Sequence, residues 1–516
     1  MMNKVIGIEL GSTRIKAVLI DGTGKVIAQG AFDWENSLVD GLWSYSLDEA
    51  KAGLQACYAG LNADYAAKFG EEITSVDAIG ISAMMHGYLA FDEAGTLLAP
   101  FRTWRNTNTG AAVEELSPLF AFNVPMRWSV AQYYESVLEG MPHVHDVAFL
   151  TTLAGYIHYL LTGRKVLGVG DASGMFPVDA EGHYDAKMLA ALNGRLAAHG
   201  VNKDFGTLLP QILLAGEDAG TLTPEGALLL DPTGRLQPGC PLCPPEGDMG
   251  TGMIATNSVA PRTANVSLGT SANFTLILEK PLKNWYPEID VIATPDGYPA
   301  ALVHTNTCTS VINTWVELFD EVIRLAGGSI GRGELFTRLF NKSAESDADV
   351  GGVVGYNYLA GEPVAHLVTG RPMLFNLPEG NLNLANFMQM QIYSAIATLA
   401  LGLDILKQED VGVDSVCGHG GFFKTPKIGQ GAMSALVDAP VTVMPTAGEG
   451  GAWGIALLAL YMGRTEVKLS AFLDELFASA EKTTVEATPE EKAQCAAFMK
   501  NYRAGLPAMR ELTANT

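Results

Sequence analysis

The sequence predicts an α/β protein built from two similar domains with a cleft between them, and three observations support this prediction. The chain has 516 residues, which is more than one hydrophobic core usually serves. A strand–glycine–strand pattern occurs near the start of the chain and again in its second half. A third glycine-rich turn, placed between a strand and a helix, follows the second copy.

The first half begins with a β-hairpin. Residues 5–30 read VIGIELGSTRIKAVLIDGTGKVIAQG, with apolar residues on a two-residue period and a GTGK turn. We expect a helix around residues 46–68 and a buried strand in the run VDAIGISAMM that follows it. The helical spacing of AFLTTLAGYIHYLL predicts a helix over residues 148–161, ended by Thr162 and Gly163. A Pro- and Gly-rich stretch, DPTGRLQPGCPLCPPEGD, then separates the two halves.

The second half repeats the opening pattern. The run ANVSLGTSANFTLIL has Leu-Gly-Thr-Ser at residues 268–271, where the first copy has Leu-Gly-Ser-Thr at residues 10–13. A long helix is expected over residues 384–406. The run VCGHGGFFKTPKIGQGAMSALVDAPVTVM predicts a strand, a glycine turn, a helix and a strand. We therefore predict two domains, at residues 1–258 and 259–516.

Composition narrows the class of protein. A net charge of −23 argues against a nucleic-acid partner, because a polyanion would be repelled. The start of the sequence lacks the apolar region and cleavage site of a signal peptide, and we find no apolar run near the roughly 18–20 residues that cross a bilayer. We expect a cytoplasmic protein without a membrane partner. The C-x-x-C of Cys240 and Cys243 has no second ligand pair for zinc, which favours a structural loop and six reduced cysteines.

The glycine turns suit an anionic ligand. A glycine followed by hydroxyl residues lets backbone N–H groups and side-chain hydroxyls point at an anion without interference from a Cβ. A plain hairpin would explain one such turn, but two related turns and a third before a helix are harder to dismiss. The helix after the third turn can offer its N-terminus to a phosphate or to the rim of a nucleotide. Neither a P-loop nor a Rossmann fingerprint is present at these turns.

Seven motifs together resemble the FGGY family of carbohydrate kinases. They are GIELGSTRIKAVLID, MMHG, GDASGMFPVD, EGDMGTGMIA, VSLGTS, YLAGEP and GHGGFFKTPKIGQGAMSALVDAPV, the last followed by EGGAWGIALLAL. Their order and spacing, from Ile6 to Leu460, are more specific than any single motif. The resemblance implies a two-domain, actin-like and hexokinase-like (ribonuclease H-like) ATPase fold in which ATP and a sugar meet in the interdomain cleft.

The resemblance also implies site residues. The candidate ATP-binding residues lie in the three turns and just beyond them: Gly11, Ser12, Thr13, Gly269, Thr270, Ser271, Gly420, Gly421 and Lys424. Lys16, on the strand after the first turn, is a further candidate for a phosphate contact, although a solvated strand face explains it equally well. The candidate sugar-binding residues are Met85, His86, Trp104, Arg105, Asn106 and Asp248. Of these, Asp248 aligns with the catalytic Asp of the family.

The sequence departs from the family pattern at several positions. Glu9 stands where an Asp is usual, and Asn106 replaces a carboxylate of the sugar pocket. The segment RWSVAQYYESV, from Arg127, lacks the Lys and Trp of the family's first signature, and AGEPV lacks the Arg-Thr that normally follows Gly-Glu. The kinase assignment survives these changes, whereas the choice of sugar is left open.

Each candidate has a non-catalytic alternative. Asp248 precedes a small-residue stretch that suits the start of a helix, so it could cap that helix instead of acting as the general base. His86 follows a buried strand, at the edge where α/β folds place ligand contacts, but could be a histidine without a role. Trp104 is expected to form an apolar wall for the sugar, or else to be a core aromatic residue.

Glu9 poses a separate question, because it is longer than the usual Asp. We predict that Glu9 and Asp248 hold Mg²⁺, which prefers oxygen ligands and keeps several waters. The extra methylene then implies that the backbone is set back by about 1.5 Å, one carbon–carbon bond. A surface salt bridge of a strand carboxylate is the alternative.

The function predicted from these features is ATP-dependent phosphorylation of a ketopentose of the xylulose or ribulose type. Other polyols or a gluconate-type acid stay open as substrates. A catalytically weak sensor of ATP and sugar, and a general actin-like ATPase or chaperone, are the competing classes. A homodimer is also left open.

Overall fold

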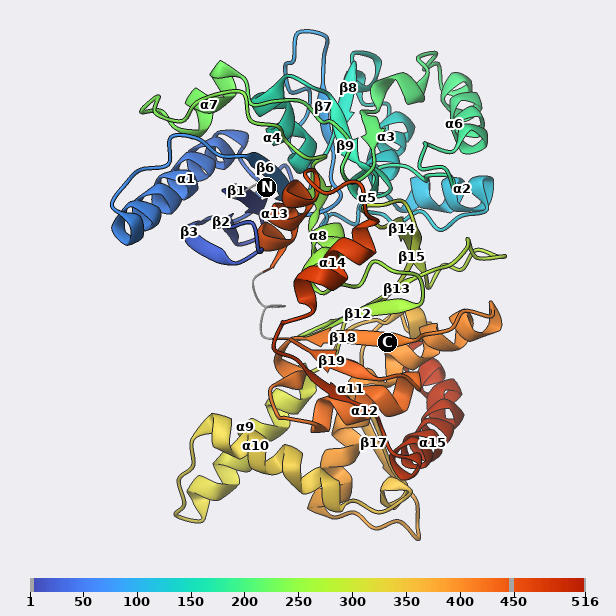
Figure 1. The fold of residues 1–516 in the computed structure, drawn as a ribbon. Coiled ribbons are helices and arrows are strands. Elements are labelled where there is room, and N and C mark those ends of the chain that lie inside the picture. Colours follow the sequence, from blue (N-terminus) through green and yellow to red (C-terminus); the bar gives the residue numbers. More distant parts are fainter. Residues whose placement is uncertain (1–3, 445–449, 515–516) are drawn as a thin grey trace.

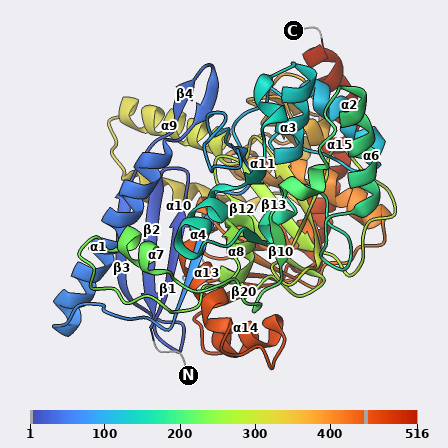
Figure 2. The ribbon, with the colours of Figure 1, turned by 90° about the horizontal axis from the view of Figure 1, so that it is seen from above.

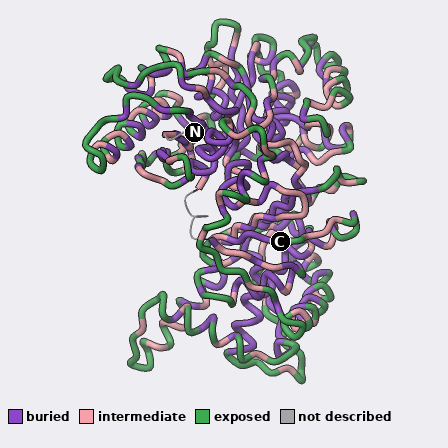
Figure 3. The backbone as a smooth tube through the Cα atoms, in the orientation of Figure 1, coloured by how far each residue is buried: buried purple, intermediate pink, exposed green. Residues whose placement is uncertain are grey.

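The computed structural model describes residues 4–444 and 450–514 and shows two halves stacked one above the other (Figure 1). Each half is centred on a β-sheet, and one hydrophobic core contains residues of both sheets, such as Val5 and Ile277. Buried backbone runs through both sheets, whereas exposed positions gather on the outer helices (Figure 3). The prediction of an α/β fold in two halves is confirmed.

The first sheet has five strands in the order β11-β6-β1-β2-β3. Strands β1 and β2 and strands β2 and β3 are antiparallel, whereas β6 runs parallel to β1 and to β11. The bounds are β1 (Val5–Leu10), β2 (Arg14–Ile20), β3 (Val26–Asp33), β6 (Ala78–Ala83) and β11 (Glu246–Gly247).

Helices cover both faces of this sheet. Helix α1 (Leu47–Phe69) and helix α7 (Pro224–Leu230) lie on its outer flank together with α4 (Leu153–Thr162) (Figure 2). On the other face pack α8 (Asp248–Ala255) and α13 (Gly451–Tyr461). The remaining elements of this half are α2 (Gly110–Phe120), α3 (Ser129–Leu138), α5 (Val169–Ala172), α6 (Ala186–Ala198), β4 (Ser37–Val39), β5 (Leu42–Ser44), β7 (Leu89–Phe91), β8 (Phe149–Thr151), β9 (Val166–Gly168) and β10 (Gln211–Leu213).

The second sheet has seven strands in the order β14-β15-β13-β12-β18-β19-β20. Their bounds are β12 (Thr263–Leu268), β13 (Ala272–Ile277), β14 (Asp290–Ala293), β15 (Pro299–Thr305), β18 (Ser415–His419), β19 (Val441–Val443) and β20 (Thr483–Val485). Below it lie α11 (Leu384–Gln408), α12 (Ile428–Val437) and α15 (Pro489–Ala514) (Figure 1). The other helices and strands of this half are α9 (Ser310–Leu325), α10 (Arg332–Lys342), β16 (Val353–Tyr356) and β17 (Met373–Asn376), whereas α14 (Leu469–Phe477) packs into the core of the first half.

The repeat seen in the sequence is a repeat of topology. In the first sheet the antiparallel strands β3, β2 and β1 are followed by the parallel strand β6. In the second sheet β15, β13 and β12 are antiparallel in the same way, and β18 is the parallel neighbour of β12. The two glycine turns therefore occupy equivalent places, between the first two strands of each sheet.

The chain returns to the first sheet late in the sequence. Helix α13 packs across β1 and β6 and against α8, although it follows the strands of the second sheet. Glycines permit this contact: a Cβ at Gly7 of β1 would lie 2.0 Å from the carbonyl oxygen of Ala452, and a Cβ at Gly454 would lie 2.1 Å from that of Thr251. Helices α13 and α14 therefore contribute to the core of the first half although they follow residue 259, and the division at residues 258 and 259 stays a prediction.

Two local predictions need correction. Residues 148–161 are not one helix, because Phe149–Thr151 form β8, paired with β7, and α4 starts after its N-cap residue Thr152. The third glycine turn is followed by one short 3₁₀ turn, Gly421–Phe423, and α12 starts only at Ile428. The N-terminus of α12 therefore lies several residues beyond the turn. The first residue of the motif EGGAWGIALLAL, Glu449, lies outside the described residues.

The expectation about apolar runs was also incomplete. Helix α11 is long and apolar enough to cross a membrane by length and composition, but 83% of its most apolar 18-residue window is buried inside the protein. All six cysteines are buried and outside disulfides, including Cys240 and Cys243.

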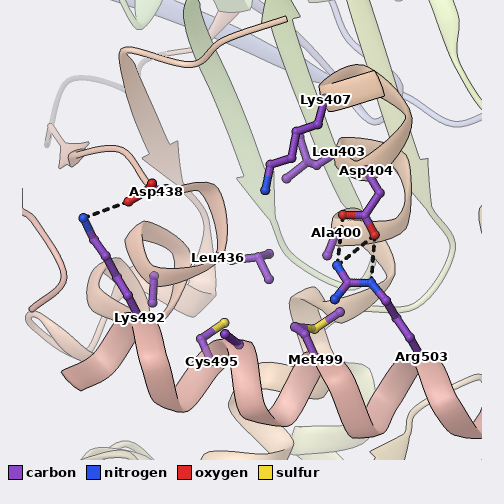
Figure 4. A pocket seen from close by; sticks show the side chains of 12 residues that line it. Ala400, Leu403, Asp404, Lys407, Leu436, Asp438, Lys492, Cys495, Met499 and Arg503 are labelled. Carbon is purple, nitrogen blue, oxygen red and sulfur yellow. Dashed lines mark hydrogen bonds and ion pairs between the residues drawn. The ribbon is translucent and has the colours of Figure 1, made fainter. Parts of the chain in front are cut away.

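A small hollow of about 280 Å³ lies between α11, α12 and α15 (Figure 4). Its charged side chains are held at the rim, where Lys492 pairs with Asp438 and Arg503 with Asp404, both at 2.8 Å. Apolar side chains and Cys495 form the floor. This hollow contains none of the residues predicted to bind ligand.

Candidate active site

One cavity of about 710 Å³ collects the predicted sugar-binding residues. Both halves of the protein line it. Its walls from the first half include Ser12, Met85, His86, Trp104, Arg105, Asn106, Arg127 and Asp248, and its walls from the second half include Asn273, Asp290, Leu302, His304 and Asn306. The cavity therefore lies where the two sheets face each other.

Asp248 is the first residue of α8 and directly follows β11. Its Oδ1 accepts a hydrogen bond from the backbone N–H of Met85 at 3.0 Å. Gly247 is the N-cap residue of α8, and Asp248 occupies the first position of the helix. Burial raises the pKa of Asp248 above its usual range. A carboxylate that gains basicity by burial and lines a ligand-sized cavity is suited to accept a proton.

His86 lies three residues beyond β6 in a left-handed backbone conformation, with φ of 70°. Its Nδ1 lies 3.3 Å from the carbonyl oxygen of Gly174, which can only accept, so Nδ1 carries the proton. Nε2 is then an acceptor, and this buried atom has no hydrogen-bond partner among residues 4–444 and 450–514. Burial lowers the pKa of His86 well below its usual value, which favours the neutral ring. The lone pair of Nε2 is therefore unsatisfied within the described residues.

The Trp104 segment forms a wall of the cavity. The Nε1–H of Trp104 donates to Oγ of Ser12 at 3.2 Å, which links the wall to the first glycine turn. Arg105 stacks on the ring of Trp43, 3.9 Å from its centroid, and donates to Oδ1 of Asn36 at 3.0 Å.

The side chain of Asn106 is engaged by the backbone. Its Oδ1 accepts from the N–H of Trp43 at 2.8 Å, while its Nδ2 donates to the carbonyl oxygens of Trp43 and Thr103. Asn106 therefore pins the wall to β5. Both donor hydrogens of its carboxamide are engaged and Oδ1 already accepts one hydrogen bond, so a sugar contact by Asn106 stays a prediction.

Glu9 lies at the end of β1, and its longer side chain reaches the start of α13. Its Oε2 accepts from the N–H of Ala452 at 3.2 Å, and a Cβ on Gly451 would lie only 2.4 Å from Oε1. Burial, and then the charge of Asp248, raise the pKa of Glu9 to about 7, whereas the charge of Lys16 on β2 acts in the opposite direction. A surface salt bridge is therefore the wrong explanation for Glu9. Two carboxylates and a lysine meet instead beside the first glycine turn.

In the first two glycine turns, backbone carbonyl oxygens accept hydrogen bonds from neighbouring segments of the protein. In the first turn, Gly11 O accepts from Nε1–H of Trp34 at 2.7 Å and Ser12 O accepts from the hydroxyl of Tyr45 at 2.6 Å. In the second turn, the carbonyl oxygens of Gly269 and Thr270 accept from the segment between β15 and α9. Carbonyl oxygens would repel a phosphate, so their engagement elsewhere suits both turns to an anion.

The third glycine turn lies against the second. Gly420 has φ of 106°, and a Cβ there would lie 2.3 Å from the carbonyl oxygen of Leu268, the residue before Gly269. Only glycine permits this approach of β18 to β12. Gly421 faces open space, and Lys424 is exposed beyond the 3₁₀ turn.

Two buried carboxylates behind Asp248 were not predicted. Glu246 accepts from the backbone N–H groups of Gly170 (3.2 Å) and Asp171 (2.9 Å), and Asp171 accepts from the hydroxyl of Thr152 at 2.6 Å. Burial raises the pKa of Asp171 to about 7 and that of Glu246 to about 8. Both residues stand inside motifs of the sequence, GDASG and EGD, but nothing in the sequence showed that these motifs meet.

A cross-half ion pair at the cavity was also missed. Arg127 pairs with Asp290 of β14, and Asn123 donates to the other carboxylate oxygen of Asp290 at 2.8 Å. Arg127 had been noted only as the start of a segment that departs from the family pattern.

Comparisons with known proteins agree with this geometry. Two protein-family models match, described as the N-terminal domain (residues 4–233) and the C-terminal domain (residues 264–463) of the FGGY family of carbohydrate kinases. A xylulose kinase of Haemophilus influenzae is 24% identical over 78% of this chain and 80% of its own length. Among solved structures, a xylulose kinase of Rhodospirillum rubrum (TM-score 0.81, 16% identity, 99% and 100% of the two chains) and a gluconate kinase of Lactobacillus acidophilus (TM-score 0.81, 16% identity, 100% of each chain) have the same fold.

Proposed function

Because this chain belongs to the FGGY family of carbohydrate kinases and is an ATP-dependent sugar kinase, we propose that its acceptor is a ketopentose of the xylulose or ribulose type. One observation supports this proposal above all. His86 and Asp248 line the same cavity, and the buried acceptor atom Nε2 of His86 has no partner within the described part of the chain. A polyhydroxylated substrate can donate one hydroxyl to Nε2 while it presents another to Asp248.

Asp248 acts as the general base in this proposal. As the sugar oxygen attacks the γ-phosphorus of ATP, the hydroxyl proton passes to the carboxylate of Asp248. The new oxygen–phosphorus bond forms as the bond to the leaving ADP oxygen breaks, and ADP departs with that electron pair. The N–H of Met85 keeps Oδ1 of Asp248 fixed during this transfer.

The two glycine turns supply the phosphate site. Ser12 of the first turn lines the cavity, and Asn273, two residues beyond the second turn, lines it from the opposite half. Donors that are already in place where charge develops stabilise the transferring group without reorganisation. Gly420 and Gly421 of the third turn, which packs on β12, and Lys424 beyond it are proposed to hold the adenosine part of ATP.

The chain offers ligands suited to Mg²⁺. No cluster of three or more His, Cys, Asp or Glu side chains is arranged to hold a metal within residues 4–444 and 450–514. Mg²⁺, however, is commonly bound by one or two carboxylates, by waters and by substrate phosphates. Glu9 and Asp248 fit that pattern, because the charge of Asp248 already raises the pKa of Glu9. When bound, the cation would neutralise charge on the phosphates of ATP.

The charges of the cavity favour a neutral sugar over a sugar acid. Arg105 is held by Trp43 and Asn36, and Arg127 is paired with Asp290. A substrate carboxylate would have to compete with Asp290 for Arg127, and it would also meet the charge of Glu288. A neutral polyol needs only hydroxyl contacts.

A panel of acceptors tests the proposal. The four xylulose and ribulose stereoisomers, xylitol, ribitol, glycerol and gluconate are each incubated with Mg-ATP, and ADP release is measured. We expect one ketopentose to have a kcat/KM at least ten times that of every polyol and of gluconate. A better polyol or aldonate, or ADP release that is independent of any acceptor, would contradict the assignment.

A further inference from the structure

Three polar side chains from the second half form the roof of the cavity. Asn273 on β13 and His304 on β15 stand directly opposite each other in the antiparallel register, and Asn306 follows shortly after β15. All three line the cavity that contains Asp248. Asn273 lies two residues beyond Ser271, so this roof adjoins the second phosphate turn.

The orientation of Asn306 is fixed by the backbone. Its Nδ2 donates to the carbonyl oxygen of Gly361 at 2.7 Å, so its Oδ1 is the atom turned to Nε2 of His304, at 3.2 Å. A carboxamide oxygen can only accept a hydrogen bond. Nε2 of His304 therefore carries a proton.

This assignment sets the role of the other ring nitrogen. Nδ1 of His304 lies 2.7 Å from the Asn273 atom placed as Oδ1, so the orientation argued next exchanges the oxygen and nitrogen of this carboxamide. A ring that carries its single proton on Nε2 has a hydrogen-bond acceptor at Nδ1. The Asn273 atom that faces Nδ1 must then be a donor, which is the amide nitrogen. This choice is open because the oxygen and nitrogen of a carboxamide are assigned from their hydrogen-bond partners. The carboxamide oxygen of Asn273 then faces away from the ring.

The surroundings of His304 favour the neutral ring. Burial, followed by the charge of Arg127, lowers the pKa of His304, and the opposing effects of Asn306 and Asp290 are smaller. Asn273 is half-buried, and its carboxamide borders the cavity. An oxygen on that side can accept a hydrogen bond from a hydroxyl group.

We propose that Asn273 is a specificity-determining residue that accepts a hydrogen bond from a sugar hydroxyl, and that His304 and Asn306 are positioning residues that hold its carboxamide in that orientation. This inference rests on the proposed sugar-kinase function of the cavity. His86 and Asp248 bind the sugar from the first half, so Asn273 contacts a hydroxyl on the opposite side. The sugar is thereby recognised by both halves at once.

The test compares steady-state kinetics of variants with the best acceptor of the panel described above. Asn273→Ala is expected to raise the KM for that acceptor about tenfold or more, while the KM for ATP stays within about twofold. Thr275→Val, two residues further along the same strand, is the matched control and should leave both constants unchanged. Because the acceptor is chosen by experiment, failure of the ketopentose assignment would not decide this test.

His304 is tested by rescue. His304→Gln retains a donor for Asn306 and an acceptor for Asn273, whereas His304→Leu retains neither. We expect the Leu variant to raise the acceptor KM as Asn273→Ala does and the Gln variant to lie closer to wild type, with thermal unfolding confirming that each variant folds. The proposal is overturned if Asn273→Ala leaves the acceptor KM unchanged, if it raises the KM for ATP equally, or if the Gln and Leu variants behave alike.

Discussion

Gly454→Ala tests how the late helix α13 positions the catalytic residue. A Cβ at Gly454 would lie 2.1 Å from the carbonyl oxygen of Thr251 in α8, whereas ordinary contact begins at 3.4 Å. The two helices must therefore separate by about 1.3 Å, the difference between these two distances. Because the contact is with backbone, the cost should reach the upper part of the usual 1–3 kcal/mol for overpacking, about 3 kcal/mol.

The displacement also bears on catalysis, because α8 begins at Asp248. A misplacement of about 1 Å in a reacting geometry costs about 10²-fold in rate, so we expect a lower Tm and a kcat reduced by about that factor. The assay is thermal unfolding followed by ADP release at saturating acceptor. The control is Gly252→Ala on α8, where a Cβ meets nothing within 4 Å and should stabilise the helix by about 0.5–1 kcal/mol. A Gly454→Ala enzyme as stable and active as wild type would refute the close packing.

Three further predictions follow from single side chains. Glu9→Gln keeps the length of the side chain and its hydrogen bond to α13 but loses the charge, so this variant should lose most activity. Glu9→Asp keeps the charge on a shorter side chain, so it should retain more activity and need more Mg²⁺ for half-maximal rate. Superimposable Mg²⁺ titrations of the initial rate would show that Glu9 is not at the metal. Trp104→Ala should raise the acceptor KM, whereas Trp104→Phe keeps the ring wall and loses only the bond to Ser12; two unchanged KM values would exclude the wall. Burial lowers the pKa of His158 to about 4 from its usual 6.5. Between these pH values the unfolded chain binds a proton that the folded protein does not. The contribution of His158 to the free energy of unfolding therefore falls by about 3 kcal/mol as the pH drops from 6.5 to 4. His158→Gln should lose less Tm than wild type over that range, and parallel curves for the two proteins would contradict this reading.

Local pattern was enough to predict most of the strands and helices. The two-residue period before and after each glycine turn produced the hairpins β1–β2 and β12–β13, and the long apolar run produced α11. The failure at residues 148–161 has a physical cause. Phe149–Thr151 fit a helical spacing as well as a strand, and only pairing with β7 decides between the two. Thr152, which caps α4, was the local signal for the true start of the helix.

Long-range packing was not predictable from the sequence. The apolar stretch of α13 was identified only as part of the last motif, EGGAWGIALLAL, because nothing local shows that it packs across β1. Half of the candidate site was unpredictable for the same reason. The site residues of the first half were found through motifs. Asn273, Asp290 and His304, in contrast, reach the cavity through the register of the second sheet. Single polar residues on alternating strand positions carry no signal of their own.

The most direct test of the account is Asp248→Asn. The variant keeps an oxygen that can accept from the N–H of Met85, so the fold and ATP binding should be preserved, but it cannot take up the proton of the sugar hydroxyl. We measure the rate of sugar phosphorylation, with ATP affinity and Tm as controls. We expect kcat to fall by about 10²-fold or more, with both controls near wild type. A variant that phosphorylates sugar at a rate near wild type would contradict the assignment of Asp248 as the general base.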